Sequence, residues 1–280
     1  MALEDIPKTV GMIYAILVFI ILSYLFHKDK FVRETKGKPG GKKTNNRTGY
    51  VVLLLTAMIG FLVFAPMFPN QFQLIVLGDT GELGVPLQMA IVGLLLFIIL
   101  TLVSGRVFCG YLCPVGAVQE IAYRTPKRKL KIKNKTVPKV FRVLFLVALI
   151  AAALKYSMGL LEYLGIKDFF MLDIESVFAL VFTGFVVASL FVYRPFCRFF
   201  CPYGVFLSLV AGKSRYKLRR TDACIDCGMC ERACPTNEAK RTDSKQECYL
   251  CYRCKVVCPV NAIEYSKKTN TAKAQKSDEE

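Results

Sequence analysis

Residues 224–235 read CIDCGMCERACP and residues 248–259 read CYLCYRCKVVCP, and these two segments decide how the C-terminal part of the chain folds. Each contains four cysteines separated by two, two and three residues, with a proline directly after the fourth. Two-residue spacers let one tight loop direct three thiolates at three irons of an iron–sulfur cube, while the fourth iron takes its ligand from elsewhere. The spacing therefore predicts two [4Fe–4S] clusters.

This spacing is that of bacterial ferredoxins, in which the fourth cysteine of each run ligates the other cluster. One expected ligand set is Cys224, Cys227, Cys230 and Cys258, and the other is Cys248, Cys251, Cys254 and Cys234. Zinc is the alternative, but zinc sites draw paired cysteines from separated segments. Disulfides are not expected in a reducing cytoplasm. We predict a small α+β ferredoxin-like domain over residues 213–267, followed by a polar tail over residues 268–280.

The first 212 residues have a different character. The chain of 280 residues is 54% hydrophobic, and its apolar residues gather in long runs. A hydrocarbon core of about 30 Å needs roughly 20 residues of helix. Five stretches reach or approach this length: Val10–Phe26, Tyr50–Pro66, Val85–Val103, Val140–Leu160 and Ser176–Tyr193. The sequence therefore predicts an α-helical membrane protein with about five transmembrane helices that contact the lipid bilayer.

The charge pattern predicts the orientation in the cytoplasmic (inner) membrane. The net charge is +17, and Lys and Arg cluster after the first, third and fifth stretches, whereas residues 67–84 contain neither. Cytoplasmic loops carry such an excess of Lys and Arg. A multi-pass protein with its N-terminus outside and its ferredoxin domain in the cytoplasm satisfies every loop. The same pattern accounts for the basic charge without a nucleic-acid partner.

An internal repeat lies inside the predicted membrane region. Residues 106–116 read RVFCGYLCPVG and residues 194–204 read RPFCRFFCPYG, at an offset of 88 residues from Cys109 to Cys197. Each copy follows a predicted two-helix hairpin of the same orientation, which indicates a duplicated unit. We expect residues 50–212 to form two repeated hairpins and residues 1–49 to add one helix and a basic loop.

Each copy of the repeat carries a cysteine pair at the cytoplasmic end of its hairpin: Cys109 with Cys113, and Cys197 with Cys201. On helical backbone this spacing would place both thiols of a pair on one face. Four converging thiols could hold a further Fe–S cluster, act as a redox-active dithiol or bind Cu(I). Simple burial of cysteine is the other reading. Arg106 and Arg194 would either offset thiolate charge or anchor helix ends.

The two repeat copies followed by the two ferredoxin runs resemble the NapH family of polytopic membrane ferredoxins, with related regions in the regulator NosR and in a cytochrome-oxidase assembly ferredoxin. The resemblance covers residues 50–264 and includes all 12 cysteines. It implies electron transfer between the quinone pool, or a membrane partner, and a redox enzyme. The chain departs from that family in its extra first helix. We also expect it to lack the flavin-binding periplasmic domain of the larger relatives, and so do not expect regulation of the NosR type.

The remaining residues limit the chemistry. A single histidine, His27, excludes a pair of haems with two histidine ligands each within this chain. We find no nucleophile with a base, no phosphate-binding loop and no nucleotide motif, and so expect no catalytic residue. The predicted role is the electron-transfer component of an oxidoreductase of the quinol dehydrogenase type, with any quinone near the membrane cysteines and a redox protein as partner. A metal or disulfide reductase acting in maturation, and a redox sensor, are the alternatives.

Overall fold

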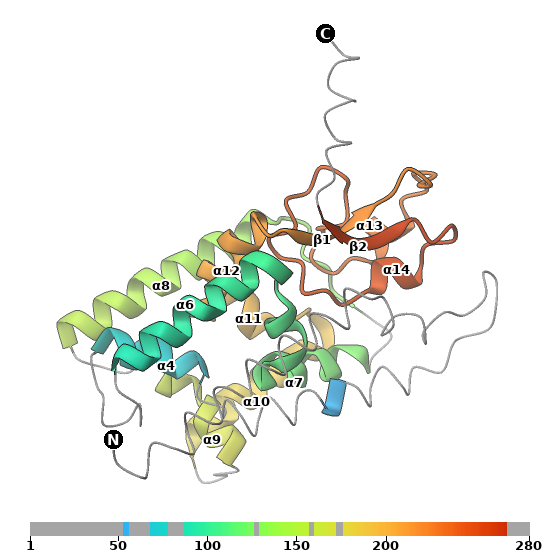
Figure 1. The fold of residues 1–280 in the computed structure, drawn as a ribbon. Coiled ribbons are helices and arrows are strands. Elements are labelled where there is room, and N and C mark those ends of the chain that lie inside the picture. The colour runs from blue at the N-terminus through green and yellow to red at the C-terminus, as the bar shows by residue number, and fades with distance from the viewer. Residues whose placement is uncertain are drawn as a thin grey trace.

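The computed structural model describes residues 53–55, 68–77, 87–125, 129–156, 160–171 and 176–267. The predicted first helix (Val10–Phe26), most of the second (Tyr50–Pro66) and the polar tail lie outside the described residues. The described chain up to residue 212 is helical, and the C-terminal remainder forms a separate lobe beside the long helices (Figure 1).

The third, fourth and fifth predicted spans correspond to three apolar helices. They are α6 (Leu87–Ser104), α8 (Thr136–Tyr156) and α10 (Val177–Phe191). Within the described residues, α8 is the one helix that is long and apolar enough to cross a membrane, and shorter apolar helices span Ile91–Ser104, Val177–Phe191 and Pro202–Gly212. The predicted multi-pass topology therefore remains a prediction.

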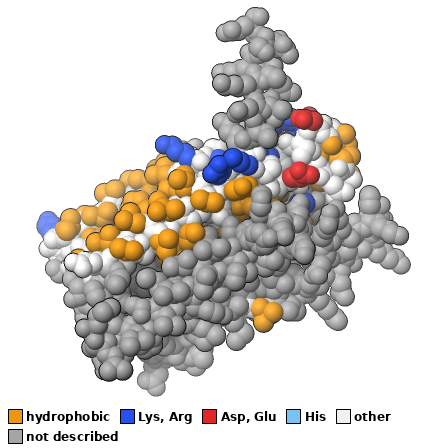
Figure 2. All heavy atoms as spheres, in the orientation of Figure 1, with side chains coloured by type: hydrophobic (Ala, Val, Ile, Leu, Met, Phe, Trp, Pro, Cys, Tyr) orange, Lys and Arg blue, Asp and Glu red, His pale blue; other side chains and the backbone are white. Residues whose placement is uncertain are grey.

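These helices present apolar side chains outward. On α6 these include Val92, Leu95 and Ile99, on α8 Leu144, Val147 and Leu154, and on α10 Val177, Leu180 and Val187, each more than half exposed. Figure 2 shows this apolar surface over α6 and α8. A contiguous apolar surface of this kind is typical of a membrane or protein interaction face.

The stretch expected to be an outer loop contains a further helix, α4 (Phe68–Leu77). The side chain of Phe72 is buried and meets Tyr203 edge-on, with ring centroids 5.6 Å apart. The buried Gln73 accepts a hydrogen bond from the backbone N–H of Leu161 at 2.8 Å. Sequence reasoning did not anticipate this helix, because its ten residues are too short for a span.

Short helices follow each of the long ones. The π-helix η2 (Phe108–Leu112) and α7 (Pro114–Arg124) follow α6, and the pair α11 (Pro195–Phe199) and α12 (Pro202–Gly212) follow α10. The loop after α8 contains the 3₁₀ turn η3 (Glu162–Leu164) and α9 (Ile166–Met171). The short helices pack crosswise, since α7 contacts α10 of the second repeat and α12 contacts α6 of the first. This exchange brings the two cysteine motifs together.

The C-terminal lobe is a small α+β unit, as predicted for a ferredoxin-like domain. Strands β1 (Tyr216–Arg220) and β2 (Ile263–Lys267) pair antiparallel, from Tyr216 opposite Lys267 to Arg220 opposite Ile263. Between them lie α13 (Met229–Ala233) and α14 (Arg253–Val256), which pack together. The Tyr265 hydroxyl donates to the Ser104 carbonyl oxygen at 2.8 Å, which ties this sheet to the end of α6.

Candidate iron–sulfur sites

Two pockets of the ferredoxin domain are each lined by four cysteines. Cys224, Cys227, Cys230 and Cys258 line one, hereafter the first site. Cys234, Cys248, Cys251 and Cys254 line the other, hereafter the second site. Each pocket thus takes three cysteines from one run and the fourth from the other run, which is the arrangement that crossed ligation requires.

Backbone N–H groups already point at the crossing cysteines. The amide of Glu238 donates to Cys234 Sγ at 3.3 Å, and the amide of Ala262 donates to Cys258 Sγ at 3.2 Å. Both acceptors are the fourth cysteine of their run. Such hydrogen bonds favour thiolate ligands, because they stabilise negative charge on sulfur.

The two cysteine runs share an unusual backbone conformation. Left-handed φ angles occur at equivalent positions within and just after the two runs: Asp226 and Leu250, Gly228 and Tyr252, and Asn237 and Asn261. Holding a leucine or a tyrosine in this region costs of order 1–3 kcal/mol and persists where the surroundings fix it, commonly at functional sites. The sharp turns direct the three thiols of each loop toward one pocket.

The two membrane cysteine pairs also share one geometry. The amide of Cys113 donates to the Phe108 carbonyl oxygen at 2.9 Å, and the amide of Cys201 donates to that of Phe196 at 3.1 Å. Cys113 and Cys201 adopt nearly identical extended conformations, and each precedes the proline that starts a new helix. The continuous helix considered from the sequence is therefore broken before the second cysteine of each pair.

The four membrane thiols, hereafter the membrane site, lie close enough to act on one another. Burial raises the pKa of Cys113, and the charges of Cys197, Cys109 and Cys201 raise it further. Burial raises the pKa of Cys197 to about 11 and that of Cys201 to about 12. Burial thus disfavours, at Cys113, Cys197 and Cys201, the thiolate form that a redox-active dithiol needs. Iron would displace the thiol protons on binding.

In the described part of the chain, no group of three or more His, Cys, Asp or Glu side chains is placed to hold a single metal ion. A zinc or copper ion draws all its ligands to one centre. A cube instead gives each thiolate its own iron, so its four ligands need not converge on one point.

Four arginines in and near the two repeats are almost completely buried: Arg106, Arg142, Arg194 and Arg198. The first three act electrostatically on thiols of the membrane site. Among the residues that the structure describes, the Nε atoms of Arg106, Arg142 and Arg198 have no hydrogen-bond partner. The buried acids beside them are Glu120 and Glu247. Cations thus outnumber carboxylates, and a buried excess of charge requires a counter-charge. A cube held by four thiolates is an anion and fits this environment.

Two of these arginines hold the first cysteine of each pair. Arg194 donates to the Cys109 carbonyl oxygen, and Arg142 donates to that of Cys197 at 3.4 Å. A glycine packs against each of these carbonyl oxygens. A Cβ at Gly116 would lie 2.7 Å from the Cys109 oxygen, and a Cβ at Gly204 would lie 3.1 Å from the Cys197 oxygen. Both repeats therefore need glycine at this position.

Buried ion pairs join the ferredoxin domain to the helices. Glu247 binds Arg106 at 3.1 Å and Arg142 at 2.7 Å. Glu120 of α7 binds Arg253 of α14 at 2.6 Å and Arg194 at 3.3 Å. Sequence reasoning singled out Arg106 and Arg194 but missed the other members, because nothing in their spacing marks them.

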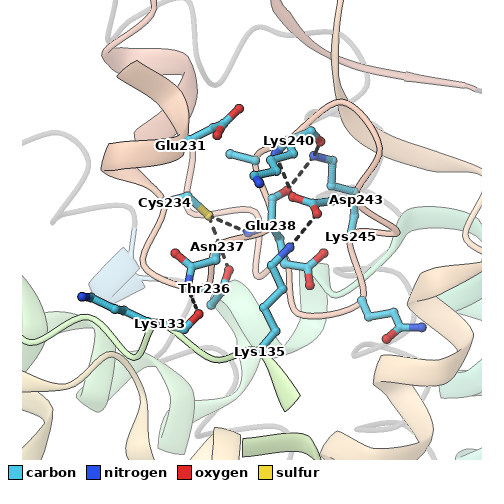
Figure 3. A network of polar contacts seen from close by, with 12 residues as sticks. Lys133, Lys135, Glu231, Cys234, Thr236, Asn237, Glu238, Lys240, Asp243 and Lys245 are labelled. Atoms are coloured by element: carbon cyan, nitrogen blue, oxygen red, sulfur yellow. Dashed lines mark hydrogen bonds and ion pairs between the residues drawn. The ribbon is translucent and has the colours of Figure 1, made fainter. Parts of the chain in front are cut away.

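The basic loop between α7 and α8 forms a second set of contacts with the ferredoxin domain (Figure 3). Lys135 Nζ lies 2.5 Å from Asp243 Oδ1. Asn237 Nδ2 donates to the carbonyl oxygens of Ile132 at 2.8 Å and Lys133 at 3.1 Å. The lysine-rich loop that was used to predict the orientation in the membrane therefore also packs close to Cys234.

The fold and the cysteine sites define a ferredoxin-type iron–sulfur protein with an apolar helical region. A family model described as a 4Fe-4S binding domain matches residues 87–133 and 176–221, and a second model with the same description matches residues 219–237. No solved structure matches the chain.

Several curated proteins are similar over most of the chain. An uncharacterized protein of Methanocaldococcus jannaschii is 31% identical over 69% of this chain and 83% of its own length. The "putative electron transport protein YccM" of Escherichia coli is 31% identical over 72% of this chain and 61% of its own length. The regulatory protein NosR of Pseudomonas aeruginosa is 26% identical over 95% of this chain and 40% of its own length. The chain belongs to the same family of ferredoxin-type 4Fe-4S proteins as these relatives, and the predicted relation to NosR is confirmed.

Proposed function

We propose that this protein is a membrane-bound electron-transfer subunit, which carries electrons between the quinone pool or a membrane redox partner and a redox enzyme. The observation that carries the proposal is the arrangement of the cysteines. Two pockets lined by four cysteines each, and a third group of four buried or partly buried cysteines, lie within one packed unit. When bound there, iron–sulfur clusters would accept and release single electrons.

In this proposal the first and second sites each hold one [4Fe–4S] cluster through crossed ligation, and the membrane site holds a further cube. Each of the two segments matched by the first 4Fe-4S model contains one membrane cysteine pair. The buried arginines and their unpaired Nε atoms supply the positive surroundings that an anionic cluster needs. Cys113 and Cys201 also cap the N-termini of α7 and α12, where negative charge is stabilised.

The proposed topology places the ferredoxin domain in the cytoplasm and the N-terminus outside, with several helices in the bilayer. The exposed apolar residues of α6, α8 and α10 support lipid contact. The basic loop packed on the ferredoxin domain supports a cytoplasmic position for that domain. A quinone would then bind near the inner leaflet, beside the membrane site.

Iron and acid-labile sulfide in anaerobically purified full-length protein test the cofactor assignment. We expect about twelve irons per chain, four for each cube. Cys109→Ser and Cys201→Ser should each lower the value to about eight. A wild-type value of about eight, unchanged by either substitution, would remove the membrane cluster. Stoichiometric Cu(I) binding that is lost in Cys109→Ser would then favour the metal-reductase alternative.

Crossed ligation predicts which variants lose the same cluster. Cys258→Ser should lose the EPR signal that Cys224→Ser loses, and Cys234→Ser should lose the signal that Cys248→Ser loses. The pairing follows from the pocket that each cysteine lines. If Cys258→Ser instead reproduced the spectrum of Cys248→Ser, each run would ligate its own cluster.

A further inference from the structure

The loop that follows Cys248 lies directly against the π-helix of the membrane site. A Cβ built on Gly110 would lie 2.5 Å from the backbone carbonyl oxygen of Tyr249. No side chain fits in that space, so the two backbones are in contact. Next to this contact, the Tyr111 hydroxyl donates to the Leu250 carbonyl oxygen at 3.0 Å.

This contact joins ligands of two different sites. Gly110 is bonded to Cys109 of the membrane site, and Tyr249 is bonded to Cys248 of the second site. A path from the Cys109 thiol to the Cys248 thiol therefore runs through covalent bonds and crosses a single van der Waals contact, the one between Gly110 and Tyr249.

Equivalent arginines of the two repeats hold the contact in place. The guanidinium carbons of Arg106 and Arg194 lie 4.2 Å and 4.9 Å from the ring centroid of Tyr249. A cation over an aromatic ring is attracted to its π-face, and more strongly where water is excluded. Arg194 also donates to the Gly110 carbonyl oxygen at 3.0 Å, so one side chain binds both partners of the contact.

We propose that the contact between Gly110 and Tyr249 is the junction for electron exchange between the membrane site and the second site, and that Arg106 and Arg194 are its positioning residues. The inference rests on the proposed function, because it needs a redox-active group at both sites. One electron leaves the group held by Cys248 and enters the group held by Cys109, or the reverse. No bond forms or breaks, and no proton moves.

The surroundings of the first and second sites indicate the order in which electrons would pass the three sites. Cys227 is exposed, and Ile225 and Met229, which line the same pocket, are exposed as well. The second site faces the junction, because Tyr249 and Tyr193 line its pocket. The sequence of sites is therefore membrane site, second site, first site.

Gly110→Ala is the direct test, with Gly184→Ala as the matched control. A methyl group at Gly110 must push the Tyr249 carbonyl away, whereas one at Gly184 of α10 meets no atom of the described residues within 4 Å. Both variants are compared as full-length, anaerobically purified protein. The readouts are iron content, the magnetic interaction between the reduced sites by EPR, and the rate of electron exchange between them after flash reduction.

We expect Gly110→Ala to keep its iron, to lose the magnetic interaction with the membrane site and to exchange electrons slower by an order of magnitude or more. Gly184→Ala should match the wild type. A Gly110→Ala protein with full iron and wild-type exchange would overturn the junction while leaving the proposed function intact. An unchanged iron content in Cys109→Ser would instead refute the membrane cluster itself.

If Gly110→Ala loses iron, substitutions of Tyr249 test whether electrons cross the junction. Tyr249→Phe keeps the ring under both guanidinium groups, and Tyr249→Leu removes it. We expect wild-type exchange in the first and slow exchange in the second. Equal rates in the two variants would remove Arg106 and Arg194 as positioning residues.

Discussion

Replacing Glu247 with glutamine should release the ferredoxin domain from the helices. Glu247 is buried and binds Arg106 and Arg142, which are also buried. Neutralising it leaves two guanidinium groups without their carboxylate in a poorly solvated interface. Breaking a buried pair by removing one partner costs about 3–5 kcal/mol. The open population should therefore rise roughly a hundredfold to several thousandfold.

Hydrogen exchange at the boundary between the ferredoxin domain and the helices measures this opening. The backbone N–H of Arg215 donates to the Leu102 carbonyl oxygen at 2.8 Å, across the boundary between the ferredoxin domain and α6. Exchange of this amide should accelerate by the same factor, because protection follows the free energy of local opening. Glu264→Gln, at an exposed position of β2, is the matched control and should leave exchange unchanged.

A double-mutant cycle separates the ion pair from general damage. Arg142→Met combined with Glu247→Gln should cost less than the sum of the two single changes, because both remove the same interaction. Additive effects, or exchange in Glu247→Gln no faster than in Glu264→Gln, would show that the buried pairs do not hold the domain in place.

The sequence was most informative where function depends on local spacing. Three thiolates of a cube come from one loop, so the runs beginning at Cys224 and Cys248 are recognisable without tertiary information. The repeat was equally visible, because its residues recur at one offset. The family comparisons agree with this reading through two matches to one 4Fe-4S model.

The parts that escaped prediction depend on contacts between distant segments. Glu247 and Arg142 are 105 residues apart in the chain, and Arg253 and Glu120 are 133 apart. No periodicity links such residues, since each looks like an ordinary surface charge within its own segment. Sequence reasoning also considered a continuous helix through Cys113, although Pro114 follows it directly. A proline disfavours helical backbone in the residue before it.

Replacing Glu120 with glutamine should raise the reduction potential of the second site and leave that of the first site unchanged. Glu120 pairs with Arg253, which lies between Cys251 and Cys254 and on which the charge of Cys251 acts directly. Without the carboxylate, the positive charge of Arg253 is no longer offset and stabilises the reduced, more negative state. For the charges of the Glu120 carboxylate and the second site we use two unit charges about 8 Å apart. At an effective dielectric constant of about 20 these interact by about 2 kcal/mol. The corresponding one-electron shift is up to about 90 mV.

Redox titration followed by EPR measures both sites in the same sample, with Glu120→Asp as the control that keeps the charge. Burial alone would raise the pKa of Glu120, but Arg253, Arg194 and Arg124 outweigh it and lower that pKa to about 2. The carboxylate therefore stays charged throughout the range in which the protein is handled, and the wild-type potential should not vary with pH on its account. Equal potentials in Glu120→Gln and Glu120→Asp, with iron content intact in both, would show that Glu120 fixes the domain interface without acting on the second site.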